Sequence, residues 1–393
     1  MQLILATIKL RIILVSEMNK ISEEQFQRIV GQRVKLARED ANLSQDELAS
    51  QLGLNDRQTL SNIEAGKRKL TAEELVKLIQ TLGKKLEYFT DTFSLIGEGA
   101  FSWRAVGAAP ASLDEFESKA GKWIGTFRRL GEIKGEPFNA LSQRLTLTER
   151  SSFEEAQAAG EALVADWDLG EVPATNLGKL VEDRLKILVL NVDAPSGISG
   201  AACQLQQFNT ILINRREPDG RRNYDFAHEI FHILTWTAMP PRPYDQADKV
   251  EGTKVKRIEQ LANNFAAALL MPSASLKPRW EKRGDQDLHD WLNETASEFQ
   301  VTSDALYWRL RQLSLLTPTA SLDINRDRLT WNGRSPSAQT LPKLFSRRFV
   351  ERMHWALDRG ELSVRRAAEL LDCTVEDLED LFKSYELRVP FDL

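Results

Sequence analysis

The sequence predicts a helix-rich α+β protein built from more than one domain. At 393 residues the chain is long enough for two or three hydrophobic cores. Most apolar residues recur at helical spacing, and the short apolar runs typical of strands lie between residues 185 and 214. We expect five segments, which in chain order cover residues 1–20, 21–95, 96–150, 151–316 and 317–393.

Residues 1–17, MQLILATIKLRIILVSE, form the ambiguous segment of the chain. They are apolar but short for a membrane span, and Lys9 and Arg11 interrupt them. The positive charges lie inside the apolar run and no small-residue cleavage site follows, so we expect no targeting signal. The β-branched content favours a strand, or else the protein proper begins at Met18.

Residues 21–95 are predicted to form a helical domain of five helices that contains a helix-turn-helix. A first amphipathic helix is expected over 27–41. Ser44 and Glu47 have the spacing of a capping box that begins a second helix, and either Asn55 or Asp56 caps the third. This arrangement resembles the Cro/repressor-type (XRE) DNA-binding domain. In that domain the second helix of the helix-turn-helix lies in the major groove.

The resemblance implies a set of DNA-contacting side chains at the start of these helices and just after them. The candidates are Gln45, Arg57, Gln58, Thr59, Ser61, Asn62, Lys67 and Arg68. Residues 28–88 contain eleven Lys/Arg and nine Asp/Glu, a small positive excess that favours operator binding as a homodimer. A protein–protein module is the alternative for this domain.

The stretch from residue 97 to 214 is predicted to change from linker to helix to strand. Residues 97–112 are rich in Gly, Ala and Pro and are interpreted as a linker. Helices are expected over 113–130 and 152–167. Strands are expected over 185–192, and as a hairpin-like pair over 203–208 and 210–214.

The segment from Tyr224 to Leu234 contains a His-Glu-x-x-His motif among apolar residues at helical spacing. On a helix, His228 and His232 lie one turn apart on the same face and can bind one metal ion. Glu229 is then placed to act on a water at that ion. The alternative is a pair of core histidines, but two of the chain's four histidines fall in this motif.

A third metal ligand is expected on the apolar helix that follows. Glu259 stands near its beginning, and Asn263, one turn later, can accept a hydrogen bond from the second nitrogen of a ligating histidine. The alternative for Glu259 is a carboxylate that stabilises the helix N-terminus.

These motifs, together with ISGA at 198–201 and the run ExxANxFAAxLLMP from Glu259, resemble the ImmA/IrrE family of zinc peptidases over roughly residues 150–316. The resemblance implies a zincin-like domain with a small sheet, Zn²⁺ bound by His228, His232 and Glu259, and Glu229 as the residue that activates water. It also implies a protein substrate, often a transcriptional repressor. The chain has Ile230-Phe231 where the family commonly has Leu-Gly.

Three further features are interpreted as parts of such a site. Residues 203–214 are proposed as an edge strand that holds substrate by strand addition. The proline-containing segment 237–252 is a candidate lid or specificity wall. Arg221, Arg222 and Tyr224 are alternative donors to a negatively charged oxygen of the reacting peptide.

The C-terminal region is predicted to be helical, with a short hairpin around 323–331. Residues 362–378 have the pattern of a second helix-turn-helix, with Ser363 and Thr374 as helix caps. The helix after Thr374 is acidic, which opposes insertion into DNA and favours a packing or protein-binding role.

The sequence thus predicts a zinc-dependent endopeptidase and transcriptional regulator. The resemblance to ImmA/IrrE peptidases implies that it cleaves a regulator protein and so derepresses stress-response, mobile-element or toxin–antitoxin genes. The alternatives are a non-cleaving transcription factor or an antitoxin whose peptidase-like domain senses a ligand or partner. Two distant cysteines fit a reducing cytoplasm, and no membrane partner is expected.

Overall fold

The computed structural model describes residues 22–136, 138, 141, 143–206, 208–241, 244–245, 253–317, 324–329 and 341–391. For 244–245 and 253–255 it describes the backbone alone. The ambiguous segment 1–17 lies outside these residues. No helix in the described part of the chain is long and apolar enough to span a membrane.

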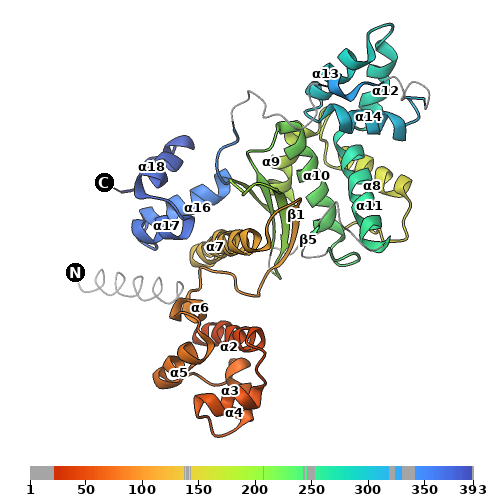
Figure 1. Ribbon diagram of the computed structural model, residues 1–393. Coiled ribbons are helices and arrows are strands. Elements are labelled where there is room, and N and C mark those ends of the chain that lie inside the picture. The colour runs from red at the N-terminus through yellow and green to blue at the C-terminus, as the bar shows by residue number, and fades with distance from the viewer. Residues whose placement is uncertain are drawn as a thin grey trace.

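The N-terminal domain consists of five helices around a core of its own (Figure 1). They are α2 (Glu23–Asp40), α3 (Gln45–Leu52), α4 (Arg57–Glu64), α5 (Ala72–Leu82) and α6 (Leu86–Thr90). The capping box of Ser44 and Glu47 is present, and Asp56 caps α4. Between them Gly53 adopts a φ of 71°, the left-handed conformation that the turn requires. The first helix begins earlier than predicted, because Ser22 forms a capping box with Gln25.

A five-stranded sheet with the order β2-β4-β3-β1-β5 forms the centre of the molecule. Its strands are β1 (Ala100–Ala105), β2 (Leu188–Val192), β3 (Ile198–Gln204), β4 (Asn209–Asn214) and β5 (Tyr244–Asp245). β3 and β4 are antiparallel, with Gly200 opposite Ile213 and Gln204 opposite Asn209, so a hairpin-like pair is present. Its second strand agrees with the predicted 210–214, but its first strand is Ile198–Gln204 and not 203–208.

Two predictions about these strands are wrong. Residues 97–112 are not a linker, because β1 pairs along its whole length with β3, from Ala100 opposite Gln204 to Ala105 opposite Ile198. Residues 203–214 are not an edge, because β4 lies between β2 and β3, and β3 lies between β4 and β1. Their backbone groups are used within the sheet and are not available to a substrate strand.

Helices cover both faces of the sheet (Figure 1). Strand side chains alternate between the faces, so Ala202 and Ile211 join one core while Ala201 and Leu212 join the other. The first core contains α8 (Phe153–Asp166), α9 (Ala174–Arg184), α10 (Asp219–Thr235), α11 (Thr253–Leu270), α12 (Ser273–Lys282), α13 (Leu288–Glu298) and α14 (Ser303–Gln312). The second contains α7 (Pro110–Lys134), α16 (Arg347–Asp358), α17 (Val364–Leu371) and α18 (Val375–Ser384).

The C-terminal helices therefore pack on the body of the protein. Ser363 caps α17 and Thr374 caps α18, as predicted. Arg366 of α17 forms a 2.7 Å ion pair with Asp91, just after the N-terminal domain. The described part of the predicted hairpin, 324–329, instead contains a 3₁₀ turn over Arg326–Arg328.

Candidate metal centre

The His-Glu-x-x-His motif lies on α10, which is buried from Asp225 to Thr235 between the sheet and α11. Phe231, where the family commonly has a smaller residue, is fully buried and packs on Phe265 of α11 with ring centroids 5.5 Å apart. The bulky side chain thus joins the two helices that carry the candidate ligands.

Replacing Phe231 with Ala is expected to lower the free energy of unfolding by about 3–5 kcal/mol, because it leaves a cavity between α10 and α11. Denaturant unfolding of the full chain measures this loss. Phe231→Leu, which fills more of the space, should cost less, and equal stability of all three proteins would contradict this role for Phe231.

The structure brings His228, His232 and Glu259 together at one point. The two Nε2 atoms are 3.0 Å apart, and Glu259 Oε2 and Oε1 lie 2.9 Å and 3.4 Å from Nε2 of His228 and His232. Donor atoms bonded at about 2.0–2.1 Å to a tetrahedral zinc are separated by about 3.3 Å. The chemistry and spacing of this donor set therefore fit Zn²⁺.

Asn263 occupies the position expected for it. Its Oδ1 lies 3.0 Å from His228 Nδ1. When Nδ1 carries the proton and donates to Asn263, Nε2 keeps a lone pair that points towards the cluster. The hydroxyl of Tyr224 donates to the Asn263 backbone carbonyl at 2.8 Å and ties α10 to α11 at this point.

The protonation of the cluster suits a cation. Burial, followed by the charge of Arg104, lowers the pKa of His228 to about 4, so that its imidazole is neutral at physiological pH. Burial opposes ionisation of Glu259, but the two imidazoles outweigh it and hold the pKa of Glu259 far below its usual range. Two histidines and one carboxylate are a common zinc ligand set.

Glu229 is only 2% exposed and projects from the same helix. Its Oε2 is buried without a hydrogen-bond partner among the described residues, and burial raises the pKa of this carboxyl to about 8. A dication nearby would favour the ionised form. The arrangement leaves one carboxylate oxygen able to accept a proton from a water molecule.

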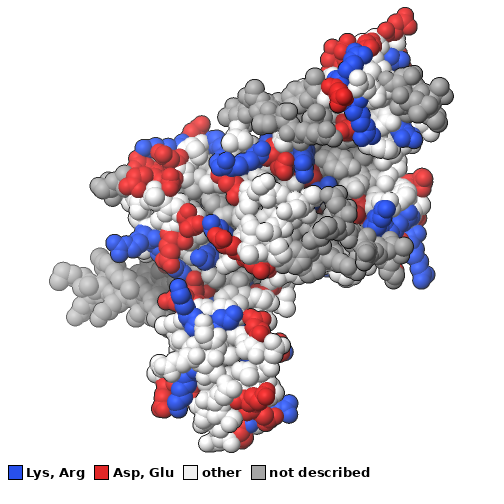
Figure 2. Space-filling model, in the orientation of Figure 1, with Lys and Arg blue, Asp and Glu red and all other residues white. Residues whose placement is uncertain are grey.

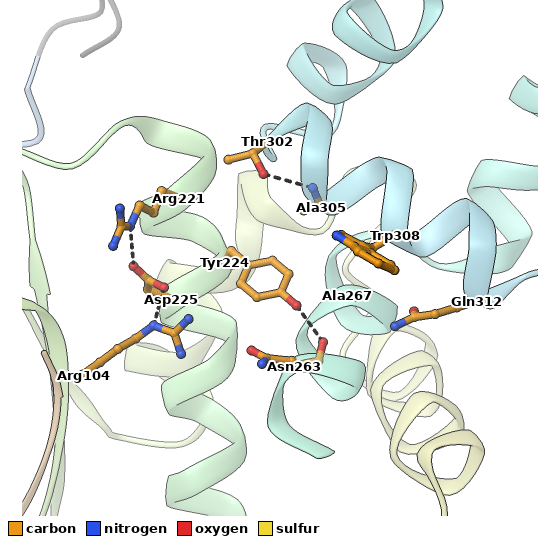
Figure 3. A pocket seen from close by; sticks show the side chains of 10 residues that line it. All are labelled: Arg104, Arg221, Tyr224, Asp225, Asn263, Ala267, Thr302, Ala305, Trp308 and Gln312. Carbon is orange, nitrogen blue, oxygen red and sulfur yellow. Dashed lines mark hydrogen bonds and ion pairs between the residues drawn. The ribbon is translucent and has the colours of Figure 1, made fainter. Parts of the chain in front are cut away.

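A cleft of about 560 Å³ adjoins the cluster between β1, α10, α11 and α14 (Figure 3). Its lining includes Tyr224, Asn263 and the half-exposed Trp308. Of the three predicted donors, Arg221 and Tyr224 line the cleft, whereas Arg222 donates to the carbonyl of Glu217 and pairs with Asp219. Most of the predicted lid, 242–243 and 246–252, lies outside the described residues.

The sequence interpretation missed two residues at this cleft, Arg104 and Asp225. Arg104 Nε lies 2.8 Å from Asp225 Oδ1, and both line the cleft. The run AFSWRA contains aromatic residues, which favour a strand, but the Gly, Ala and Pro on either side outweighed this signal.

The predicted DNA-contacting residues lie at the start of α3 and α4 and after α4. Arg57 is exposed, and its Nε donates to Gln45 Oε1 at 3.0 Å, so the first residues of the two helices lie together. Gln58 and Lys67 are also exposed, and Thr59, Ser61 and Asn62 are half-buried.

Two features limit the positive charge of this surface. Arg68 donates to both carboxylate oxygens of Glu74, at 3.1 Å and 2.8 Å, within the domain. On the face drawn in Figure 2, acidic and basic side chains lie next to one another over the domain instead of forming one basic surface. This agrees with the small charge excess counted in the sequence.

Comparison with known families matches two parts of the chain. Residues 182–311 match the peptidase family described as IrrE N-terminal-like domain, and residues 34–89 match a helix-turn-helix family. The first region contains the whole His-His-Glu cluster and the second contains the predicted DNA-contacting residues. The chain thus combines a metallopeptidase-like domain with a helix-turn-helix.

No curated protein matches the chain. Among solved structures, the apo form of the competence regulator ComR from Streptococcus vestibularis matches 92% of this chain and 100% of its own, with 13% identity and a TM-score of 0.16.

Proposed function

We propose that this chain is a zinc-dependent endopeptidase that also binds DNA and regulates transcription by cleaving a regulator protein. The observation that carries the proposal is the buried cluster of His228, His232 and Glu259, with Glu229 beside it and a cleft adjoining it. A purely structural site would not explain why Oε2 of Glu229 is buried without a hydrogen-bond partner among the described residues.

Zn²⁺, held by His228, His232 and Glu259, would supply Lewis-acid chemistry that makes water nucleophilic near neutral pH. The residues of the chain do the rest. Asn263 fixes the orientation of the His228 ring. Glu229 takes the proton of the attacking water and passes it to the leaving amine, as a general base and then a general acid. The packing of α10 on α11 holds these groups in place.

The substrate would be another protein, which a cleft open at the surface can admit. It is lined by residues of β1, α10, α11 and α14 (Figure 3). A repressor or a toxin–antitoxin component is the proposed substrate class, on the resemblance to ImmA/IrrE peptidases.

The test is a search for new N-termini in a lysate of the native host. Zinc-loaded wild-type protein should generate a small set of new N-termini by mass spectrometry, and Glu229→Gln protein should generate none of them. Identical sets from the two proteins would remove the support for a peptidase.

Binding of DNA by the N-terminal domain is the second part of the proposal. Arg57→Ala in the full chain is expected to weaken binding to sequences selected from a random DNA pool by about tenfold or more, because a good contact to a base is worth about 1–3 kcal/mol. Electrophoretic mobility shift over a series of salt concentrations measures this.

Lys84→Ala, which removes the same charge outside the predicted contact set, should leave the affinity within about twofold. If no sequence is enriched from the pool by the wild-type protein, the domain is a protein-interaction module instead. Sedimentation of the protein–DNA complex would show whether two copies bind together, as the proposed homodimer requires.

A further inference from the structure

Arg104 faces the candidate centre from a strand that lies outside the matched peptidase-like region. Successive side chains of β1 alternate between the faces of the sheet. Trp103 is fully buried on the α7 side, where its Nε1 donates to Glu117 at 2.6 Å. Arg104 therefore projects to the opposite face, towards α10.

The guanidinium of Arg104 is held at one end only. Its Nε lies 2.8 Å from Oδ1 of Asp225, a carboxylate that is 2% exposed. Asp225 stands four residues before Glu229 on α10, and the two therefore share one face of the helix. Burial opposes the charge of Arg104, but the negative charges of Asp225, Glu229 and Glu259 outweigh this effect and raise the pKa of Arg104.

The other end of the guanidinium points into the cleft. Within the described residues, Arg104 has no polar partner besides Asp225, and Figure 3 shows its remaining nitrogens directed into the space between Asp225 and Asn263. Arg309, by contrast, uses all three nitrogens for Met271 O, Gln157, Gln312 and Glu161. Arg309 is a structural cation, whereas Arg104 retains donors for a ligand.

The cleft is suited to negative charge. Its described lining contains two cations, Arg104 and Arg221, and one carboxylate, Asp225. Among the described residues, neither NH₂ group of Arg104 has a partner. A fixed, planar guanidinium is the side chain best matched to carboxylate oxygens and other negatively charged oxygens.

We propose that Arg104 binds an anionic oxygen of the substrate in this cleft, an inference that rests on the proposed peptidase function. This oxygen has two potential sources. It is either the carbonyl oxygen of the cleaved peptide, which becomes negative during the reaction, or a carboxylate already present on the substrate.

The first source is an oxygen that becomes negative during the reaction. The oxygen of water forms a bond to the carbonyl carbon, its proton passes to Glu229, and the electron pair of the C=O double bond moves onto the carbonyl oxygen, where Arg104 donates to it. When the double bond reforms, the C–N bond breaks and Glu229 returns the proton to the amine.

The experiment measures binding to zinc-loaded protein with two blocked dipeptides. One is a phosphinic analogue of Ala-Ala, blocked at both ends, whose tetrahedral phosphinate is its only anion. The other is acetyl-Ala-Ala, whose only anion is the C-terminal carboxylate. The same dipeptide with a neutral C-terminal amide is its uncharged control. The variants are Arg104→Lys and the double variant Arg104→Met/Asp225→Asn, which leaves no unpaired buried charge.

Arg279→Lys is the matched control, because Arg279 has a similar side-chain exposure to Arg104 (21% against 23%) and pairs with carboxylates away from the cleft. Metal content is measured for every variant, so that weaker probe binding caused by a loss of zinc is distinguished from weaker probe binding caused by the loss of Arg104.

Both Arg104 variants are expected to bind the phosphinate at least about tenfold more weakly, with Arg279→Lys unchanged. Weaker binding of acetyl-Ala-Ala alone would support the same chemistry with a substrate carboxylate as its source. Unchanged binding of both probes, or no binding of either to the zinc-loaded wild type, would overturn the inference.

The two proposals fail in different ways. If the wild type takes up no zinc and produces no new N-termini, the proposed function itself is wrong. If it does both, and the Arg104 variants bind the probes as the wild type does, only the role of Arg104 is wrong.

Discussion

Glu229→Gln is expected to lower the rate of peptide cleavage by about 10²–10⁴-fold while the protein retains its zinc, because the amide cannot accept the proton of the attacking water. The amide has nearly the same volume as the carboxylate and replaces a buried group that is 2% exposed, so folding should be little affected. The measurement is kcat for a substrate identified from its new N-terminus.

The effect should appear in kcat and leave KM nearly unchanged, since Glu229 is assigned to the reaction and not to substrate binding. Glu161→Gln is a control, because this carboxylate lies on α8 and pairs with Arg309 away from the cluster. Equal turnover by wild type and Glu229→Gln would show that another residue activates the water.

His232→Ala is expected to abolish tight zinc binding, because it removes one of three donors that lie within 4.8 Å of one another. Zinc should then no longer raise the melting temperature. For the wild type, free zinc at a thousandfold excess over Kd stabilises the folded state by about 4 kcal/mol. Thermal unfolding with and without added zinc measures the difference.

The chain offers a matched control for this variant. His354 lies on α16, where its Nε2 is 2.7 Å from the backbone oxygen of Arg388, remote from the cluster. His354→Ala should keep the zinc-dependent rise in melting temperature. If His232→Ala keeps it as well, the ion is bound elsewhere and the cluster is not the metal centre.

Local features of the fold could be predicted from the sequence. Ser44, Asp56 and Thr374 cap the helices that follow them, since a cap depends on residues two or three positions away. The convergence of His228 and His232 follows from the helical repeat in the same way.

Features that depend on distant pairing could not be predicted. β1 is a strand because Phe101 pairs with Cys203, about a hundred residues later in the chain. Without β1 the predicted strand order is incomplete, and the sequence suggests an edge at residues 203–214. The same omission hid Arg104, whose partner Asp225 lies on another element.

The most direct test of the central claim is the transcript profile of a host strain in which Glu229 is replaced by Gln, compared with the wild type and with a deletion of the gene. If regulation depends on cleavage, the Glu229→Gln strain should match the deletion at the regulated genes. A profile that matches the wild type would contradict the account and identify the chain as a DNA-binding regulator that acts without cleaving.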